Sequence, residues 1–464
     1  MRPEPARRSG GPVRFVRPAA VLPNRDVQSA WVDWDTSSVV TVASALPASL
    51  GGGTLLGTSL ALNNARWLEV RPDGALALCY AVQGGLVVWF RDGTGWTSYE
   101  IPRVSTSLGG TPLTATFSEP SVTTDGADFF VAAQMYYTWG RGTSATSDAS
   151  IVVARFRLGS MGWSHAWMDA SGAETWASSP SVTCSSTGRV FVTYAAAASG
   201  APVGTTETGI YVRDVQGRTT WQAQAYPSGA PEETAYLPSA SAGPDRLFLV
   251  WETTNASGSR KSVWGRAIPY AADGSLDTAA ATAATAIAGT MAGEATKAWD
   301  PCVLALNTGV GAVAYQQYPS VVTNTWIYTQ QSADGATWSS KTQATEVDST
   351  ATLLVDRFPS LAASRTNVLL VCEARAVPSL TAQATLLGGT GLSWYHAPTT
   401  ATQDEAVGSL PVLTTNADSA SYPTITALVG NAYVAWKVTT LDKATGVVIA
   451  ESIQFAEGTV REVP

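Results

Sequence analysis

The sequence predicts an all-β fold, specifically a seven-bladed β-propeller with an extended N-terminal arm, and three observations lead to this prediction. A pair of short strand-like segments recurs with a period of about 60 residues, which is typical of architectures built from one small sheet per repeat. Between the two segments lies a turn that usually contains glycine. Charged residues make up only 14% of the chain, with 41 glycines and 17 tryptophans, a composition that favours short strands and turns over helices.

Seven copies of this pair can be read along the chain, and six blades remain the alternative count. Six copies have a proline at the start of their first segment, and one, which begins at Trp67, lacks it. The six prolines stand in Glu119-Pro120, Ser179-Pro180, Leu237-Pro238, Asp300-Pro301, Phe358-Pro359 and Tyr422-Pro423. A third strand follows in several copies, for example at Gly85–Phe90 and Ser150–Phe156.

Residues 1–29 read as a separate, extended basic arm. Six arginines fall within the first 26 residues, among several prolines and glycines, a composition that resists packing into a core. The arm is either a disordered tail or an anchor that orders when it docks on neighbouring subunits of a larger particle. It contains no apolar segment typical of a signal peptide, so we expect synthesis in the cytoplasm and a final location in a virion or another extracellular particle.

Residues 30–464 form the predicted propeller, which we expect an N-terminal strand to close. The last repeat offers three strands, at Thr424–Leu428, Ala432–Val438 and Val447–Phe455. The segment Ser38–Ala43 can pair with them as the outermost strand and hide an otherwise exposed sheet edge. The tail Thr459–Val463 is the competing candidate for that position.

Composition excludes several functions. The net charge of −8 argues against a general nucleic-acid binder, because such proteins need positive charge to displace phosphate counterions. No apolar run is long enough to predict a membrane span. Neither a CxxC pair nor a Cys/His spacing indicates a metal site, and no motif indicates a cofactor. We interpret the cysteines, one in each of four repeats, as small buried hydrophobic residues: Cys79, Cys184, Cys302 and Cys372.

Two turns late in their repeats, Ser332–Trp338 and Asp92–Trp96, combine aspartate, glycine and a closing tryptophan. They resemble the Asp-box, or BNR repeat, of sialidase-like β-propellers; the first is one residue short of the motif and the second is looser. In such a turn the aspartate caps backbone amides, glycine supplies a positive φ, and the tryptophan packs between blades. Asp334 is therefore expected to be structural. We also expect His165 and His396, which lie in aromatic strand segments, to be structural.

The candidate site lies beside the repeat prolines, where we expect the chain to enter each innermost strand from one face of the disc. Aromatic rings can stack on the apolar faces of sugars while polar side chains bind their hydroxyl groups. The predicted ligand-binding residues are Trp67, Glu119, Tyr236, Trp299, Asp300, Arg357 and Tyr422.

These features favour a non-catalytic adhesion protein that recognises surface glycans, such as a phage tail or head appendage. A glycan-cleaving enzyme, either a sialidase-like hydrolase or a polysaccharide lyase, is one alternative. The resemblance to sialidases implies an arginine triad, for which Arg66, Arg357 and Arg375 are candidates, and a Tyr–Glu pair such as Tyr422 with Glu373. A structural docking scaffold within a large assembly is the other alternative.

Overall fold

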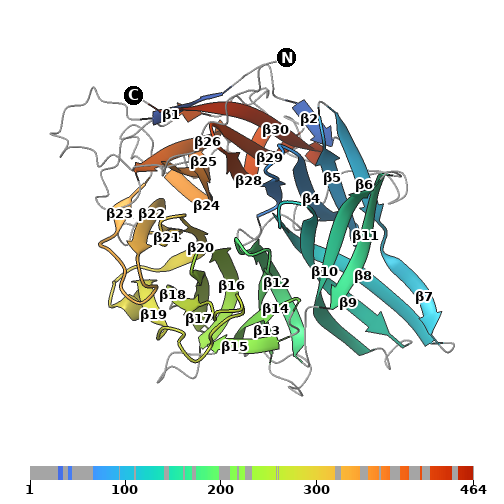
Figure 1. Ribbon diagram of the computed structural model, residues 1–464. Coiled ribbons are helices and arrows are strands. Elements are labelled where there is room, and N and C mark those ends of the chain that lie inside the picture. Colours follow the sequence, from blue (N-terminus) through green and yellow to red (C-terminus); the bar gives the residue numbers. More distant parts are fainter. Residues whose placement is uncertain are drawn as a thin grey trace, which may run out of the picture.

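The structure is a computed structural model in which the strands assemble into seven sheets arranged as a ring (Figure 1). It describes residues 30–34, 40–43, 66–93, 95–108, 111–140, 146–159, 162–169, 174–197, 209–216, 219–224, 233–255, 257, 259, 261–318, 325–344, 354–364, 367–376, 387–396, 408–409, 418–441 and 448–462. The predicted arm, residues 1–29, lies outside these ranges.

Six sheets are built from consecutive strands. The first contains β3 (Leu68–Val70), β4 (Leu76–Val82), β5 (Gly85–Arg91) and β6 (Trp96–Ile101), and the second contains β7 (Val104–Leu108), β8 (Thr111–Thr124), β9 (Phe129–Trp139), β10 (Thr146–Gly159) and β11 (Gly162–Asp169). The third contains β12 (Thr175–Cys184), β13 (Val190–Ala197), β14 (Gly209–Asp214) and β15 (Thr219–Gln224).

The next three sheets follow the same plan. They contain β16 (Glu233–Ala242), β17 (Arg246–Asn255), β18 (Lys261–Pro269) and β19 (Thr285–Gly289); β20 (Ala298–Ala305), β21 (Gly311–Gln317), β22 (Trp326–Ser332) and β23 (Thr342–Gln343); and β24 (Leu354–Ser364), β25 (Asn367–Ala376), β26 (Leu387–His396) and β27 (Gly408–Ser409). A short 3-10 turn, η5 (Thr290–Ala292), follows β19.

The seventh sheet joins the two ends of the chain. It contains β28 (Asp418–Leu428), β29 (Asn431–Leu441) and β30 (Val448–Glu462), with β1 (Ala30–Trp34) and β2 (Val40–Ala43) both paired to β30. In the register, Val40 lies opposite Phe455 and Ala30 opposite Glu462. The segment that begins at Thr459 is thus the end of β30 itself, and β1 covers its edge.

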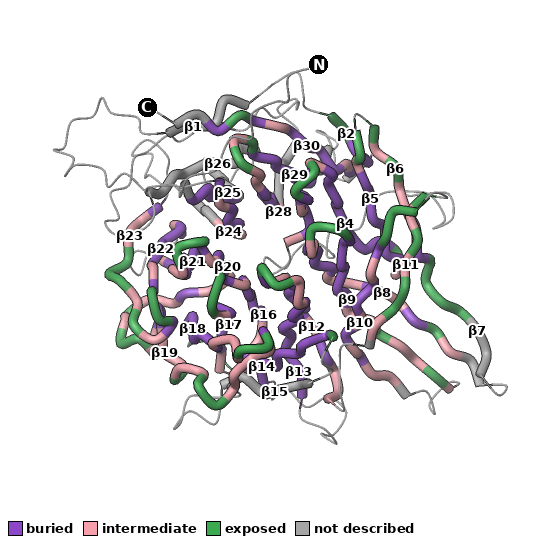
Figure 2. The backbone as a smooth tube through the Cα atoms, viewed as in Figure 1, coloured by how far each residue is buried: buried purple, intermediate pink, exposed green. Residues whose placement is uncertain are grey.

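The innermost strands β3, β8, β12, β16, β20, β24 and β28 each contact the next around the ring. The predicted all-β propeller is therefore confirmed. The hydrophobic cores lie between neighbouring sheets; one, for example, packs Phe130 of β9 with Tyr194 of β13. Figure 2 shows the buried residues running along the middle strands of the sheets.

The repeat prolines mark a β-bulge inside six of the seven innermost strands, not the start of the strand as the sequence predicted. The residue before each of the six prolines has a φ between 49° and 54°. At each bulge the register with the second strand shifts, as between Ser118 and Ser121 in β8. Left-handed backbone is costly for a residue other than glycine and uncommon before proline. Its recurrence in six sheets indicates that the bulge is part of the architecture.

The serine that follows the proline links neighbouring sheets. Its Oγ accepts a hydrogen bond from a backbone amide in the innermost strand of the next sheet, which explains the recurring Pro-Ser. The four such bonds are Val182 N to Ser121 (3.2 Å), Ala240 N to Ser181 (3.2 Å), Val303 N to Ser239 (3.2 Å) and Ile425 N to Ser360 (3.3 Å).

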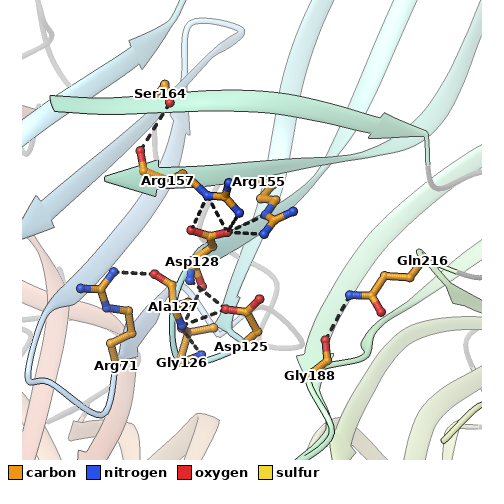
Figure 3. Close-up of polar contacts among 11 residues, drawn as sticks. Arg71, Asp125, Gly126, Ala127, Asp128, Arg155, Arg157, Ser164, Gly188 and Gln216 are labelled. Carbon is orange, nitrogen blue, oxygen red and sulfur yellow. Dashed lines mark hydrogen bonds and ion pairs between the residues drawn. The ribbon is translucent and has the colours of Figure 1, made fainter. Parts of the chain in front are cut away.

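At the ends of the strands farther from the bulges, arginines connect neighbouring sheets. Arg71, beside β3, donates to the carbonyl of Ala127 in the next sheet at 2.7 Å (Figure 3). Arg71 also pairs with Asp73. Arg189 and Arg246 likewise donate to carbonyls of their next sheets, those of Asp273 and Ala333. Figure 3 also shows a local ion cluster, in which Arg155 and Arg157 converge on the buried carboxylate of Asp128.

The turn Ser332–Trp338 has the predicted construction. The Oδ1 atom of Asp334 accepts hydrogen bonds from the amides of Ala336 (2.8 Å) and Thr337 (2.7 Å), and Gly335 has a φ of 78°. These bonds lower the pKa of Asp334 to about 2. The Trp338 ring lies against Gly265 of the preceding sheet, where a side chain would collide with it. Asp334 is therefore a turn-capping residue in this structure.

The other late tryptophans also pack on the preceding sheet. Trp163 stacks on Phe90 with ring centroids 3.8 Å apart, and Trp96 meets Phe455 edge-on at 5.1 Å. His165 lies in the same packing layer, with its Nδ1 atom 2.9 Å from the Tyr99 hydroxyl. Burial lowers the pKa of His165. The structural interpretation of this histidine is confirmed, whereas the side chain of His396 lies outside the described residues.

Candidate functional site

The candidate site is built around Glu252, at the point where β17 passes the bulge of β16. The register places Glu252 opposite Tyr236, just before the Leu237-Pro238 bulge. Its carboxylate is completely buried and accepts three hydrogen bonds. The donors are the Tyr236 hydroxyl (2.5 Å), the Lys261 ammonium (2.8 Å) and the backbone amide of Asp300 in the next sheet (3.1 Å).

Lys261 stands between two aromatic rings. Its Nζ atom is 5.8 Å from the centroid of Tyr236 and 5.8 Å from that of Trp299, which belong to neighbouring sheets. A cation at this distance from a ring face is attracted by the electron density of the ring. The ion pair with Glu252 fixes the ammonium in this position, with 31% of the lysine side chain still exposed.

Asp300 joins the group from the bulge of β20. Burial raises the pKa of its carboxyl group to about 7, and the Glu252 carboxylate adds to this rise. Lys261 and Arg357 oppose the rise, which places the Arg357 charge close enough to act on Asp300. Burial and the adjacent Glu252 carboxylate also raise the pKa of the Tyr236 hydroxyl far above its usual range, so this hydroxyl remains a hydrogen-bond donor at neutral pH.

Further aromatic rings extend the group over the next two sheets. Arg357 lies over the Phe358 ring at 5.0 Å, and Phe358 contacts Tyr422 at 4.9 Å between centroids. On the other side Trp299 meets Tyr318 edge-on at 4.8 Å. We call the whole group the Lys261 cluster: Tyr236, Glu252, Lys261, Trp299, Asp300, Tyr318, Arg357, Phe358 and Tyr422.

The structure thus brings together five of the seven predicted ligand-binding residues: Tyr236, Trp299, Asp300, Arg357 and Tyr422. Trp67 is only 2% exposed and lies in the core between sheets, so its ring is not available to a ligand. The Glu119 carboxylate accepts the amide of Ser179 at 2.6 Å, where it caps the bulge of the next sheet. Burial raises the pKa of Glu119, and the Ser179 hydrogen bonds oppose this rise.

The predicted ligand-binding residues did not include the central part of the cluster, Glu252 and Lys261. One signal was present, because the apolar strand from Leu247 to Trp251 runs directly into a glutamate. Lys261 gave no such signal, since its role depends on rings contributed by two different sheets.

Of the three arginines proposed for an enzyme, the structure describes the side chains of Arg66 and Arg357. Arg66 donates to the carbonyl of Val303, on the far side of the ring. The side chains of Arg375 and Glu373 lie outside the described residues. Within the described part of the chain, no group of three or more His, Cys, Asp or Glu residues is placed to hold a metal ion. The four cysteines are free thiols; three of them are buried, and Cys184 is half-buried.

Comparisons with known proteins give fold-level similarity only. No family model matches the sequence, and no curated protein matches it. Among solved structures, a Dyadobacter fermentans protein of unknown function is 14% identical, with a TM-score of 0.44, over 74% of this chain and 95% of its own. Trypanosoma rangeli sialidase bound to the inhibitor DANA is 9% identical, with a TM-score of 0.40, over 84% of this chain and 54% of its own.

A thermostable family-43 glycoside hydrolase is also similar, at 9% identity and a TM-score of 0.35, over 62% of this chain and 94% of its own. The chain therefore spans about half of the sialidase and nearly all of the other two proteins. Similarities of this size carry no information about ligand or chemistry. No helix in the described part of the chain is long and apolar enough to cross a membrane.

Proposed function

We propose that the protein binds carbohydrate through the Lys261 cluster. The observation that carries this proposal is the placement of the Lys261 ammonium between the rings of Tyr236 and Trp299 by a fully buried glutamate. Rings held in this way can pack against the apolar faces of a pyranose, while Lys261, Asp300 and Arg357 offer groups for its hydroxyls or carboxylates.

A glycan array followed by calorimetry on the best oligosaccharide tests this function. Trp299→Ala should weaken binding by about 1–3 kcal/mol, the cost of removing one well-packed aromatic anchor. Tyr136→Ala is the matched control, because Tyr136 is an exposed aromatic residue on a different sheet, and its binding should equal that of the wild type. Binding that is unchanged in Trp299→Ala, or absent from the whole array, would overturn the proposal.

One observation favours glycan cleavage as a second candidate. Glu252 and Asp300 are neighbouring carboxyl groups in different ionisation environments, since burial keeps Asp300 partly protonated near neutral pH while Lys261 pairs with Glu252. Such a pair can divide acid and base roles. Sugar release from the bound oligosaccharide that disappears in Asp300→Asn, with binding retained, would support this candidate. Binding without release would leave the non-catalytic function.

The setting we propose for this binding is a virion or another extracellular particle, in which the arm (residues 1–29) docks on neighbouring subunits. The six arginines near the N-terminus support an electrostatic contact with an acidic groove. Deleting residues 1–26 should leave the melting temperature unchanged and abolish co-assembly with the partner subunits. Normal co-assembly of the shortened protein would contradict this role of the arm.

A further inference from the structure

The sheet β7–β11 carries most of the exposed large hydrophobic residues. Seven such residues are exposed in the described part of the chain, and five belong to this sheet. They are Val104, Tyr136, Trp139, Leu158 and Trp167. Figure 1 shows β7 and the adjoining ends of β8 and β9 projecting outward at the lower right, beyond the other sheets.

The strand register places four of these five residues on one face. Val104 is paired with Ala115, which is paired with Tyr137, and Trp139 lies two residues further along β9. Tyr137 is paired with Asp148, and the same alternation along β10 leads to Leu158 and to Ala154, the partner of Trp167. Paired residues share a face and alternate residues return to it. Tyr136 therefore lies on the opposite face.

Unequal strand lengths explain why this face is uncovered. The remaining part of the same face of the sheet β7–β11, which includes Phe117, Phe129 and Phe156, is buried in the core shared with the sheet β3–β6. The strands β8 and β10 are 14 residues long, whereas those of the covering sheet have three to seven residues. The longer strands therefore extend past their neighbour, and the apolar face continues into solvent.

The two exposed tryptophan rings are held in fixed orientations by other rings. Trp167 is 42% exposed and stacks on Phe117, with an interplanar angle of 4° and 5.5 Å between centroids. Trp139 is 37% exposed and stacks on Tyr137 at 5.4 Å and 22°. The Tyr137 hydroxyl in turn donates to Asp148 at 3.3 Å. Each tryptophan is thus supported by a neighbouring ring and still presents surface to solvent.

We propose that this face is a second binding surface, for a neutral polysaccharide. Ordered aromatic rings can pack on the apolar faces of successive sugar units with little loss of side-chain entropy. Among the described side chains that the register places on this face, Asp148 carries the one formal charge. That charge is already engaged, because Asp148 accepts hydrogen bonds from Tyr137 and the amide of Trp176. Among the described side chains of this face an acidic glycan would find no cation, whereas an uncharged chain needs none.

Affinity electrophoresis through gels that contain hydroxyethyl cellulose, laminarin, xylan or soluble starch tests this surface. We expect at least one of these neutral polysaccharides to retard the wild-type protein. Trp139→Ala and Trp167→Ala should each weaken that binding about tenfold, as expected for the loss of one aromatic anchor worth roughly 1.4 kcal/mol. Tyr136→Ala, on the same strand but the opposite face, is the matched control and should migrate like the wild type.

The two proposed sites can be separated in the same assay. Trp139→Ala and Trp167→Ala should each reduce the retardation that remains in Trp299→Ala, because the two tryptophans and Trp299 belong to different sheets. If Trp299→Ala alone abolishes the retardation, the polysaccharide binds at the Lys261 cluster and the second surface is refuted. This surface does not depend on the function proposed for the cluster, so either proposal can fail alone.

Three other results would overturn the proposal. They are no retardation by any of the four polysaccharides, retardation that both tryptophan variants retain in full, and a dimer that Trp139→Ala converts to a monomer in light scattering. The last result would identify the face as a contact between copies of the chain. The melting temperature of each variant is measured to show that it is folded. If Trp167→Ala unfolds because Phe117 loses its cover, Trp139→Ala, at the projecting end of the sheet, decides the question.

Discussion

At two bulges in this ring a glutamate caps a backbone amide, but the two glutamates have different surroundings. At Ser179 the backbone amide of the bulge is capped by Glu119 from the preceding sheet, and at Asp300 the equivalent amide is capped by Glu252. Glu119 binds only groups of Ser179 among the contacts described: the backbone amide at 2.6 Å and the side chain. Glu252 also binds a tyrosine hydroxyl and a lysine, between rings from two sheets.

This difference distinguishes the contacts that the architecture requires from those that we propose serve ligand binding. Capping the bulge amide explains why a buried acid is needed at both places, because an unpaired buried amide is costly. It does not explain Lys261, Trp299 or the nearby Arg357. Because of these contacts beyond the common structural requirement, we propose ligand binding at the Lys261 cluster and not at the Glu119 bulge.

Removing the Glu252 carboxylate should have the largest effect on stability. Glu252→Ala leaves a lysine, a tyrosine hydroxyl and a bulge amide without their acceptor, and breaking a buried ion pair costs about 3–5 kcal/mol. Denaturant unfolding measures this loss. Glu252→Gln, which keeps acceptors for the amide and the hydroxyl, should lose less. Equal losses in the two variants would show that the charge of Glu252 contributes nothing.

Glu119→Ala should cost less, about 1–3 kcal/mol, because one capped amide loses its acceptor. Oligosaccharide binding at the Lys261 cluster should be unchanged, as measured by calorimetry at a temperature where the variant is folded. A loss of affinity comparable to that in Trp299→Ala would make Glu119 part of the binding site, as the sequence predicted, and would weaken the distinction between the two bulges.

Each hydrogen bond between a serine and the next sheet should contribute less to the free energy of unfolding than Glu119 does. Ser239→Ala removes the acceptor of the Val303 amide, and we expect a loss of about 1–2 kcal/mol in the free energy of unfolding. Val303 lies in β20, so the change should also speed amide hydrogen exchange in that strand. Unchanged stability and exchange would show that the recurring Pro-Ser is not a link between sheets.

Asp300→Asn should have the smallest effect at pH 4, and its effect should grow as the pH rises. The pKa of Asp300 is about 7 in the folded protein, against 3.8 for the unperturbed group. The folded state therefore holds an extra proton between these values, and the wild type loses stability as pH rises from about 4 to 7. The asparagine variant should melt like the wild type at pH 4 and about 2–4 °C higher at pH 8. A lower melting temperature than the wild type at pH 8 would mean that ionised Asp300 is stabilised in the folded protein.

Much of the fold could be predicted from the sequence because its signals are local and repeated. Proline, glycine and apolar runs mark the strands, and the tryptophans of the late turns mark contacts with the preceding sheet. The left-handed backbone before each proline could not be predicted, because that residue is usually extended. The extension of β8–β10 past the neighbouring sheet could not be predicted either, because it depends on the shorter strands of that sheet.

The site was predictable only in part for the same reason. Position beside a repeat proline correctly grouped Tyr236, Trp299 and Asp300, because the ring brings equivalent positions of successive sheets together. It could not separate these residues from Trp67, whose ring turns into the core. Glu252 and Lys261 were not among the predicted ligand-binding residues, because their importance comes from contacts between sheets that are distant in sequence.

A crystal structure with the best oligosaccharide of the glycan array bound at saturating concentration tests the central claim most directly. We predict a sugar ring packed against Trp299, with its polar groups in contact with Lys261, Asp300 or Arg357. An oligosaccharide bound only elsewhere, with the Lys261 cluster unoccupied, would contradict the account.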